Sequence, residues 1–469
     1  MSKINFFING QQVSVEDPTG STTLLDWLRE NASLKGTKEG CNEGDCGACT
    51  VIIESIEENR LVHAAVNSCI LFLPQLHNKS IRTIEGVSSP DGNLHPVQEA
   101  MIKYNGNQCG FCTPGIVMSL VSAHTNGYSR DLDTILAGNL CRCTGYDPII
   151  NAGNESLQKP KPDWFERSEL KIDDKPSVSQ GKFDLIPDNI EEFSEWYANH
   201  PDATLIAGGT DVGLWVTKEL KSLQSPCYIS DIPELKKIKI SGNTLTVGAT
   251  TTLTKFDEII SKYYPSLSVL LNRFGSVQIR NSATVGGNIA NGSPIGDLPP
   301  ALIALSSTLI LRKKSTRRRI PLEDFFVDYG VQDRESGEFV EGIEIPLHHK
   351  WFRSYKISKR RDQDISAVCG CFLLELDHQI VQNVRIAYGG LAAIPKRATE
   401  TEAFLLGKTL NLATIQEAIE ILEKDFQPIT DMRASSDYRI QIAKNLLLKF
   451  YFERIRRSGF SSIDHYQVN

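Results

Sequence analysis

The sequence lacks a long apolar segment. None of its apolar runs approaches the roughly 18 to 20 residues that a membrane-spanning helix needs. The first residues, MSKINFFING, also lack the basic and apolar pattern of a secretion signal. We therefore expect a cytoplasmic protein that does not enter a membrane. Its thiols are then expected to stay reduced and available to metal.

Basic residues are not in excess either. The chain has 50 Lys and Arg against 57 Asp and Glu, a net charge of −7, and a pI near 5.8. A nucleic-acid partner is not expected, because phosphate binding needs a basic surface. With 469 residues, 41% apolar and 23% charged, the chain has material for about three globular domains.

Cysteine is abundant, and its spacing is informative. Eight of the eleven cysteines fall in the first third of the chain, in two sets of four. The first set has C-x4-C-x2-C spacing and a distant fourth member: Cys41, Cys46, Cys49 and Cys69. This is the plant-type ferredoxin pattern for a [2Fe–2S] cluster. Glycines between the ligands let backbone N–H groups approach cluster sulfurs: Gly40, Gly44 and Gly47.

The residues around the first set predict a β-grasp ferredoxin domain. Strands are expected at 4–8 and 12–15 around the turn Asn9-Gly10, a capped helix at 21–30, and a strand at 50–54. A zinc site or a pair of disulfides is the alternative for four such cysteines. Zinc sites usually pair two short knuckles, whereas here three ligands share one glycine-rich loop.

The second set of cysteines is unlike that of a ferredoxin. It consists of Cys109, Cys112, Cys141 and Cys143. Apolar residues at helical spacing predict four short helices around it, at 95–104, 114–124, 131–137 and 147–157. The ligands would then lie on two turns of a small helical bundle. Spacing alone leaves a zinc site open here.

The sequence around the second set favours an iron–sulfur cluster. Gln108-Cys-Gly-Phe-Cys-Thr-Pro-Gly115 and Asn139-Leu-Cys-Arg-Cys-Thr-Gly145 resemble the second [2Fe–2S] domain of the molybdenum hydroxylases. The resemblance implies a second [2Fe–2S] cluster on these four cysteines. It also implies that Gln108 touches the pterin of a molybdenum-binding partner.

A linker is expected after the second set. The stretch from about 151 to 181 is polar, contains prolines and lacks sustained periodicity, so it is interpreted as a surface linker. We place the ferredoxin domain at 1–85, the helical domain at 86–158 and the linker at 159–182. Two further domains are placed at 183–349 and 350–460. Three further cysteines in strand-like apolar segments are expected to be core thiols: Cys227, Cys369 and Cys371.

Two glycine turns follow the linker, at 203–213 and 282–288. Successive backbone N–H groups in such turns form a nest that cradles a pyrophosphate. Neither turn fits G-x-G-x-x-G, so a Rossmann dinucleotide site is not expected. With Arg280-Asn281 before the second turn and Ser293–Asp297 after it, the pair resembles the FAD domain of the same family. That resemblance implies a vanillyl-alcohol-oxidase-type fold, which holds FAD between two α+β halves.

The resemblance also implies which residues contact FAD. The diphosphate lies against Leu205, Ile206, Ala207, Gly208, Gly209, Thr210, Asp211 and Val212, and against Ala283, Thr284, Gly286, Gly287 and Asn288. Further flavin contacts are implied for Phe274, Asp297, Val340 and Lys356. Val340 stands where animal members of the family have leucine.

Two other features are expected near the flavin. Tyr329 matches a tyrosine close to the isoalloxazine, but Gly330 follows it where animal members have arginine. The charged loop 359–365 matches a segment near which nicotinamide approaches, although it also reads as a solvated charge run. No catalytic residue is assigned beyond Tyr329 and Lys356 as side chains near the flavin.

The last part of the chain resembles the C-terminal domain of carbon monoxide dehydrogenase flavoproteins. Strands are expected at 367–376 and 380–387, and helices at 410–424 and 437–456. The apolar stripes of the two helices are interpreted as core. The whole chain is therefore expected to be a multidomain α+β protein.

The resemblance implies the electron-transfer subunit of a xanthine dehydrogenase. Electrons from xanthine or hypoxanthine would enter at a molybdopterin-binding large subunit, pass the second and then the first cluster, and reach FAD and NAD+. No molybdopterin domain follows residue 469, so substrate oxidation is expected on that partner, with two copies of each subunit in the assembly.

Several alternatives stay open. Another molybdenum hydroxylase, acting on an aldehyde, nicotinate or another heteroaromatic ring, would use the same subunit. A stand-alone iron–sulfur flavoprotein without molybdenum is a second option, and a zinc-binding scaffold is a third. The sequence does not decide between NAD+ and oxygen as the electron acceptor.

Overall fold

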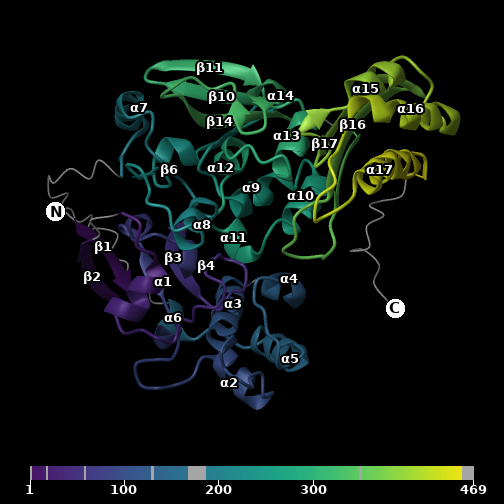
Figure 1. Cartoon of the computed structure of the whole chain (residues 1–469). Helices are drawn as coiled ribbons and strands as arrows, with labels where there is room; N and C mark the ends of the chain where they lie inside the picture. The colour runs from purple at the N-terminus through teal and green to yellow at the C-terminus, as the bar shows by residue number, and fades with distance from the viewer. Residues whose placement is uncertain are drawn as a thin grey trace. The chain divides into compact units, whose positions relative to one another are not determined.

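The computed structural model describes residues 3–16, 20–57, 60–127, 131–166, 186–347 and 351–456. The chain divides into two compact units (Figure 1). The first unit comprises Met1–Asn189, Asp202–Ile232 and Gly275–Ala283. The second comprises Ile190–Pro201, Pro233–Phe274 and Thr284–Asn469. Two segments from the middle of the chain thus belong to the N-terminal unit.

A five-stranded mixed sheet opens the first unit, in the order β2-β1-β5-β3-β4. Its strands are β1 (Lys3–Ile8), β2 (Gln11–Glu16), β3 (Thr50–Glu57), β4 (Arg60–Asn67) and β5 (Ser80–Arg82). Asn9 and Gly10 take positive φ angles of 50° and 81°, as the predicted hairpin requires. The hairpin and the strand expected at 50–54 are confirmed.

The helix expected at 21–30 is only partly formed. Thr23 caps it, since its Oγ1 accepts a hydrogen bond from the Asp26 N–H at 3.2 Å. Only α1 (Leu24–Asp26) is α-helical, and a π-helical turn follows at Trp27–Asn31. The wider turn directs Trp27 and Leu28 into the core of the sheet. Sequence periodicity does not distinguish such a turn from an α-helix.

Four helices follow the sheet, as predicted, and gather in one group (Figure 1). They are α2 (Pro96–Lys103), α3 (Thr113–Asn126), α4 (Leu132–Leu136) and α5 (Asp147–Ser156). Pro114 lies in the first turn of α3, and Gly127, with a φ of 67°, ends it. The second cysteine set therefore lies on the α2–α3 and α4–α5 connections.

The polar stretch from 151 is in part helical. α5 continues to Ser156, as expected for the helix at 147–157, and a short helix, α6 (Asp163–Glu166), lies inside the linker placed at 159–182. Phe165 is only 1% exposed, and the Trp164 indole donates to the Val87 carbonyl at 3.3 Å. These two aromatic residues fix a polar segment to the helical core. The remainder of the predicted linker, 167–182, lies outside the described residues.

The two middle segments of the first unit contribute short elements. These are β6 (Leu205–Ile206), α8 (Val212–Thr217), β7 (Cys227–Tyr228) and α11 (Val277–Arg280). β6 and β7 pair in parallel, and Ile206 and Tyr228 pack on Phe72. Cys227 is fully buried, as expected for a core thiol.

The second unit contains two larger sheets. The first has the order β11-β10-β14-β9-β8, with strands β8 (Ile238–Ser241), β9 (Thr244–Gly248), β10 (Thr308–Lys313), β11 (Thr316–Pro321) and β14 (Phe339–Pro346). A two-stranded ribbon is formed by β12 (Phe326–Asp328) and β13 (Val331–Gln332). The associated helices are α7 (Ile190–Asn199), α9 (Leu253–Ile260), α10 (Pro265–Asn272), α12 (Val285–Ala290), α13 (Leu298–Ala304) and α14 (Leu322–Phe325).

The C-terminal part of the second unit is a sheet covered by helices. The sheet has the order β15-β16-β17-β18, with β15 (Trp351–Ile357), β16 (Val368–Asp377), β17 (Ile380–Gly389) and β18 (Lys396–Arg397). Beside it lie α15 (Thr399–Leu405), α16 (Leu412–Asp425) and α17 (Ser436–Arg456) (Figure 1). The predicted strands and helices are confirmed, and the apolar stripes of α16 and α17 join one core around Phe372 and Tyr388.

Cys369 and Cys371 are buried in β16, as predicted for core thiols. Within the described ranges, none of the helices combines the length and apolar character needed to cross a lipid bilayer.

Candidate electron-transfer site

The first cysteine set converges at the end of the ferredoxin-like sheet. The Cys49 and Cys69 sulfurs lie 3.3 Å apart, and the Cys41 thiol is in contact with those of Cys46 and Cys69. Three backbone N–H groups, of Glu43, Asp45 and Cys46, donate to the Cys41 sulfur at 3.3–3.4 Å. This loop therefore already has the N–H···S geometry that stabilises a thiolate ligand.

The electrostatics of Cys41 follow from these contacts. Hydrogen bonds from the Cys46 and Cys69 thiols, and then from the backbone, hold the pKa of Cys41 well below its usual value against the effect of burial. A low pKa favours the thiolate, which is the form that binds metal.

The glycines of this loop leave no room for a side chain. A Cβ on Gly40 would lie 2.6 Å from the Cys46 sulfur, and a Cβ on Gly47 would lie 2.0 Å from the Gly138 carbonyl oxygen. Gly44 and Gly47 also take positive φ angles of 80° and 70°. The donor set and the loop shape thus fit an iron–sulfur cluster.

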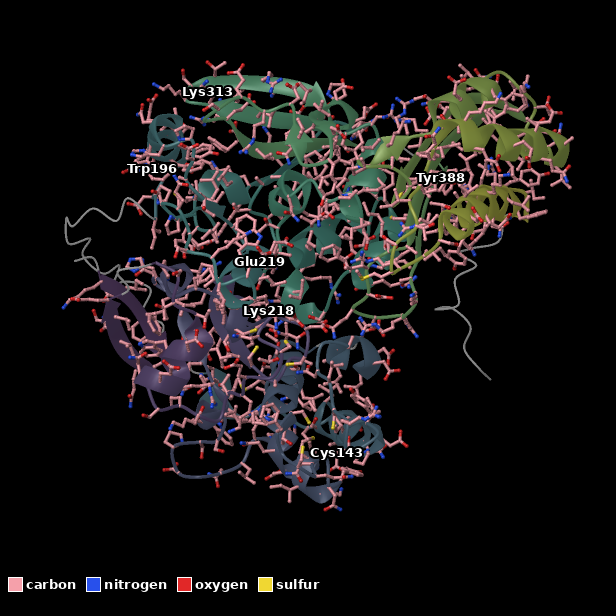
Figure 2. The ribbon with its side chains drawn as sticks, viewed as in Figure 1. Cys143, Trp196, Lys218, Glu219, Lys313 and Tyr388 are labelled. Carbon is pink, nitrogen blue, oxygen red and sulfur yellow. The ribbon has the colours of Figure 1, made fainter. Side chains whose placement is uncertain are left out.

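The second cysteine set is also assembled, but it faces solvent. The Cys109 thiol contacts that of Cys143, and the Cys112 thiol contacts that of Cys141. Cys109 and Cys143 are exposed, and Figure 2 shows sulfur atoms beside Cys143. Burial, the largest cause, raises the pKa of Cys112 to about 12.

Within the described part of the chain, no group of three or more His, Cys, Asp or Glu side chains is arranged for a single metal ion.

A short backbone link joins the two sets. The N–H of Leu140, next to Cys141, donates to the carbonyl of Cys46 at 2.9 Å. Cys46 is itself a proposed cluster ligand, and Leu140 directly precedes another, Cys141. One hydrogen bond therefore connects the ligand backbone of one set to that of the other.

A buried polar cluster holds this link in place. The Asn139 amide donates to the Gly47 carbonyl at 3.1 Å and accepts from the Ser119 hydroxyl at 2.7 Å. The Gln278 amide, from α11, donates to Ser119 and to Asn139, both at 3.0 Å. These contacts join both ligand loops to a segment that lies far along the chain.

Replacing Asn139 with alanine should loosen this junction. The Gly47 carbonyl and the Ser119 and Gln278 side chains would lose a buried partner, which typically costs about 1–3 kcal/mol. Chemical unfolding should report that loss, and low-temperature electron paramagnetic resonance should report a weaker magnetic interaction between the reduced clusters. Asn107→Ala, at an exposed asparagine, is the control. Equal behaviour of the two variants would contradict the role given to Asn139.

Two thiols of the first set, Cys49 and Cys69, are buried where the middle segments meet them, whereas Cys41 and Cys46 are partly exposed. Leu25, Ile70, Leu214 and Ile279 pack around Cys49 and Cys69, which are 2% and 1% exposed. Leu214 follows the first glycine turn, and Ile279 precedes the second. The buried half of the first set is thus in contact with segments adjoining the predicted FAD contacts, whereas Cys109 and Cys143 of the second set are exposed.

The first glycine turn is formed by close approach of two segments. A Cβ on Gly208 would lie 2.1 Å from the Ser282 carbonyl and 3.0 Å from the Ala283 Cα, so the turn adjoins Ala283, another of the predicted FAD contacts. Gly209 has a φ of 75°, and the Gln75 amide donates to the Ala207 carbonyl at 3.0 Å. Leu205–Val212 and Ala283 therefore form one half of the predicted FAD contacts, all in the first unit.

The part of the second glycine turn that lies in the second unit, residues 284–288, differs from the predicted nest. The Gly286 N–H donates to the Ala249 carbonyl at 2.8 Å, and the Gly287 N–H donates to the Thr284 Oγ1 at 3.1 Å. The Asn288 N–H donates to the Thr284 carbonyl at 3.0 Å. Because these N–H groups already donate to protein oxygens, a nest for pyrophosphate does not explain why glycines stand at positions 286 and 287.

Space is the better explanation for these two glycines. A Cβ on Gly286 would lie 2.5 Å from that of Ala249, so this glycine packs the turn against the protein. Gly287 is exposed, and its added Cβ would meet only the Thr284 hydroxyl, at 2.8 Å. The buried Asn288 Oδ1 has no hydrogen-bond partner. The turn thus leaves room for a ligand close to Gly287, beside the side-chain amide of Asn288.

A buried ion pair lies among the other predicted contacts in the second unit. The Lys356 Nζ and Asp297 Oδ2 are 2.6 Å apart, with side chains 3% and 5% exposed, and the Ser366 hydroxyl donates to Asp297 at 2.5 Å. Val340, in β14, is 7% exposed. The structure joins Asp297 to Lys356, which the sequence had presented as separate positions.

The predicted nicotinamide-side residues are exposed. Tyr329 is 72% exposed, and a Cβ on Gly330 would meet nothing within 4 Å. In the loop 359–365, the Arg360 N–H donates to Asp364 at 2.7 Å, and Lys359 donates to the Met432 carbonyl at 3.0 Å. Phe274, the remaining predicted contact, is half-buried in the same unit. Their contact with a cofactor stays a prediction.

Four domain models match most of the chain. They are a 2Fe-2S iron-sulfur cluster binding domain at 6–73, a [2Fe-2S] binding domain at 83–154, the FAD binding domain in molybdopterin dehydrogenase at 182–348, and the CO dehydrogenase flavoprotein C-terminal domain at 353–453. The chain therefore has two [2Fe–2S] domains, an FAD-binding domain and a flavoprotein C-terminal domain, and the predicted fold class is confirmed.

Similar proteins include xanthine dehydrogenase 2 of Arabidopsis thaliana, 31% identical over 95% of this chain and 39% of its own length. Xanthine dehydrogenase of Emericella nidulans is 30% identical over 98% of this chain and 39% of its length. The chain thus spans about two fifths of these relatives. Carbon monoxide dehydrogenase from Hydrogenophaga pseudoflava, in a structure lacking the Mo-pyranopterin moiety, is 26% identical with a TM-score of 0.55, covering 58% of this chain and 96% of that one.

Proposed function

Because this chain belongs to the molybdenum hydroxylase family, we propose that it carries electrons from a molybdopterin centre to NAD+. Electrons would pass first to a cluster on Cys109, Cys112, Cys141 and Cys143, then to a cluster on Cys41, Cys46, Cys49 and Cys69. FAD would receive them next and NAD+ last. We infer that the protein is the electron-transfer subunit of a xanthine dehydrogenase.

The contrast in burial between the two thiol sets carries this proposal. Cys109 and Cys143 are exposed, beside Phe111 and Leu140, which are each 48% exposed. Cys49 and Cys69 are buried, and two residues of the FAD-domain sequence, Leu214 and Ile279, pack against them. An exposed set suits exchange with a partner, and an enclosed set suits exchange with the flavin. The Leu140–Cys46 hydrogen bond lies between them.

Each group has a definite place in this scheme. FAD, when bound, takes up single electrons from iron–sulfur centres and supplies a pair as hydride to nicotinamide. The protein supplies the cysteine ligands for the clusters. For FAD it supplies open space beside Gly287 and the buried Lys356–Asp297 pair. The exposed Tyr329 and loop 359–365 leave an approach for NAD+.

A molybdopterin-binding partner subunit is part of the proposal. The apolar side chains of Phe111 and Leu140 beside the exposed thiols suit contact with protein. Gln108, also exposed, is the residue proposed to touch the pterin. We propose two copies of each subunit. The relatives named xanthine dehydrogenase support xanthine or hypoxanthine as substrate, and another heteroaromatic or an aldehyde is the alternative.

Anaerobic addition of NADH to the isolated chain tests the acceptor half of the proposal. NADH should bleach the flavin absorbance and then the iron–sulfur absorbance, since the path runs in both directions. NADPH is the comparison. A chain whose flavin stays oxidised under NADH, while dithionite bleaches it, would contradict NAD+ as the acceptor.

A further inference from the structure

Lys218 lies against the ligand loop of the first thiol set. Its ammonium group donates to the Cys41 carbonyl at 3.0 Å and is 3.6 Å from the Glu43 carboxylate. Both residue pairs belong to the first unit, and Figure 2 labels Lys218. A positive charge from the FAD-domain sequence is thus hydrogen-bonded to a cluster ligand's own backbone.

The packing of α8 fixes this position. A Cβ on Gly213, in the second residue of α8, would lie 2.7 Å from the Cβ of Ile70, so the helix packs directly on the short 3-10 helix Ser68–Ile70 that contains Cys69. The Lys218 N–H donates to the Leu214 carbonyl at 2.9 Å, and Leu214 packs on the thiol set. The backbone of Lys218 is therefore anchored close to the ligands.

Charge around the set gives the cation a role. Two unit negative charges sit on an oxidised [2Fe–2S] cluster with four thiolates, and a single added electron makes three. A nearby cation stabilises the more negative state, and a nearby carboxylate such as that of Glu43 opposes it. Lys218 both adds positive charge and pairs with Glu43.

We propose that Lys218 raises the reduction potential of the cluster on Cys41, Cys46, Cys49 and Cys69. It is a positioning residue, because it acts through the ligand loop and touches no reacting atom. The inference rests on the proposed function in one respect, the assignment of these cysteines as cluster ligands. Its consequence is that one electron leaving the exposed cluster is drawn toward the enclosed one, next to the FAD-binding segments.

Potentiometric titration followed by electron paramagnetic resonance tests this in the complex purified through the full chain. Lys218→Gln should lower the midpoint potential of the first cluster so that the ratio of reduced to oxidised cluster falls about tenfold at a fixed potential, equivalent to ~59 mV for a one-electron couple. The second cluster should keep its potential. In Lys218→Arg the midpoint potential of the first cluster should stay close to that of the parent protein. In Glu43→Gln it should rise.

Lys221→Gln is the matched control. Lys221 lies three residues further along and pairs with Glu219 at 2.5 Å, not with the ligand loop. Because Lys218 is 45% exposed, the effect of its charge should also shrink at high salt, whereas a change of structure would not. An unshifted first cluster in Lys218→Gln, or an equal shift in Lys221→Gln, would overturn the inference.

The proposed function fails in a different way. If the parent protein shows fewer than two cluster signals, the ligand assignment itself is wrong and the inference falls with it. Two signals of which neither responds to Lys218→Gln leave the ligand assignment intact and reject only the role of Lys218.

Discussion

Replacing Cys112 with serine is expected to stop substrate-driven electron flow while leaving the flavin bound. Cys112 is one of four thiols at the exposed set, and a hydroxyl is a harder and poorer ligand for an iron–sulfur cluster than a thiolate. Removing a residue that only hydrogen-bonds to a metal ligand typically lowers metal affinity or activity by about 10–100-fold. Loss of a ligand itself should therefore lower the rate of substrate-driven NADH formation by more than about 100-fold. Stopped-flow absorbance and iron analysis are the measurements, and half the iron should be lost.

Cys227→Ala is the matched control for this variant. Burial raises the pKa of Cys227 to about 12, as it does for Cys112, but Cys227 lies in β7 and belongs to neither set. It should keep all iron and near-parent electron transfer. NADH should still bleach the flavin of Cys112→Ser, since that step does not use the exposed set. Native rates with substrate in Cys112→Ser would refute the ligand assignment.

Replacing Gly287 with leucine is expected to give a protein poor in flavin. The residue is exposed, and its own Cβ would meet only the Thr284 hydroxyl, at 2.8 Å, so the strain is confined to the first turn of α12 and the apoprotein should fold. The added side chain would fill the space that a diphosphate needs beside Thr284 and Asn288. We expect at least about a tenfold loss of flavin affinity, or ~1.4 kcal/mol. Flavin released on denaturation, measured per chain, is the readout.

The iron content separates a local effect from misfolding in this variant. Both thiol sets lie in the first unit and Gly287 in the second, so Gly287→Leu should keep its full iron. Gly287→Ala should fall between the parent and the leucine variant. Gly286→Ala is not a suitable comparison, because its Cβ would clash with Ala249 and disturb the turn. Full flavin occupancy in Gly287→Leu would argue against a diphosphate at this turn.

Local patterns allowed much of the fold to be predicted. The hairpin at Asn9-Gly10, the end of α3 at Gly127 and the two cysteine sets depend on residues close together in sequence. The same reasoning failed at Trp27–Asn31 and at Trp164–Phe165. At both places the burial of aromatic side chains in the core decides the backbone conformation. Neither helical periodicity nor polar composition predicts that burial.

The contacts that assemble the site were beyond such patterns. Gln278 lies 139 positions from Asn139, and Lys218 lies 177 positions from Cys41. An isolated glutamine or lysine carries no spacing signal for such pairs. For Asn139, its place directly before Leu140-Cys141 was a clue, but only the fold shows that its amide reaches Gly47. The glycine turns were found from sequence, whereas the use of their N–H groups within the protein was not.

The most direct test of the central claim is xanthine oxidation by the native complex captured through this chain. NADH formation from xanthine and NAD+ should be measured together with molybdenum, iron and flavin on the same sample. The account predicts xanthine-dependent NADH, with stoichiometric molybdenum and two [2Fe–2S] clusters per flavin. A complex that contains iron and flavin but no molybdenum, and forms no NADH from xanthine, would contradict it.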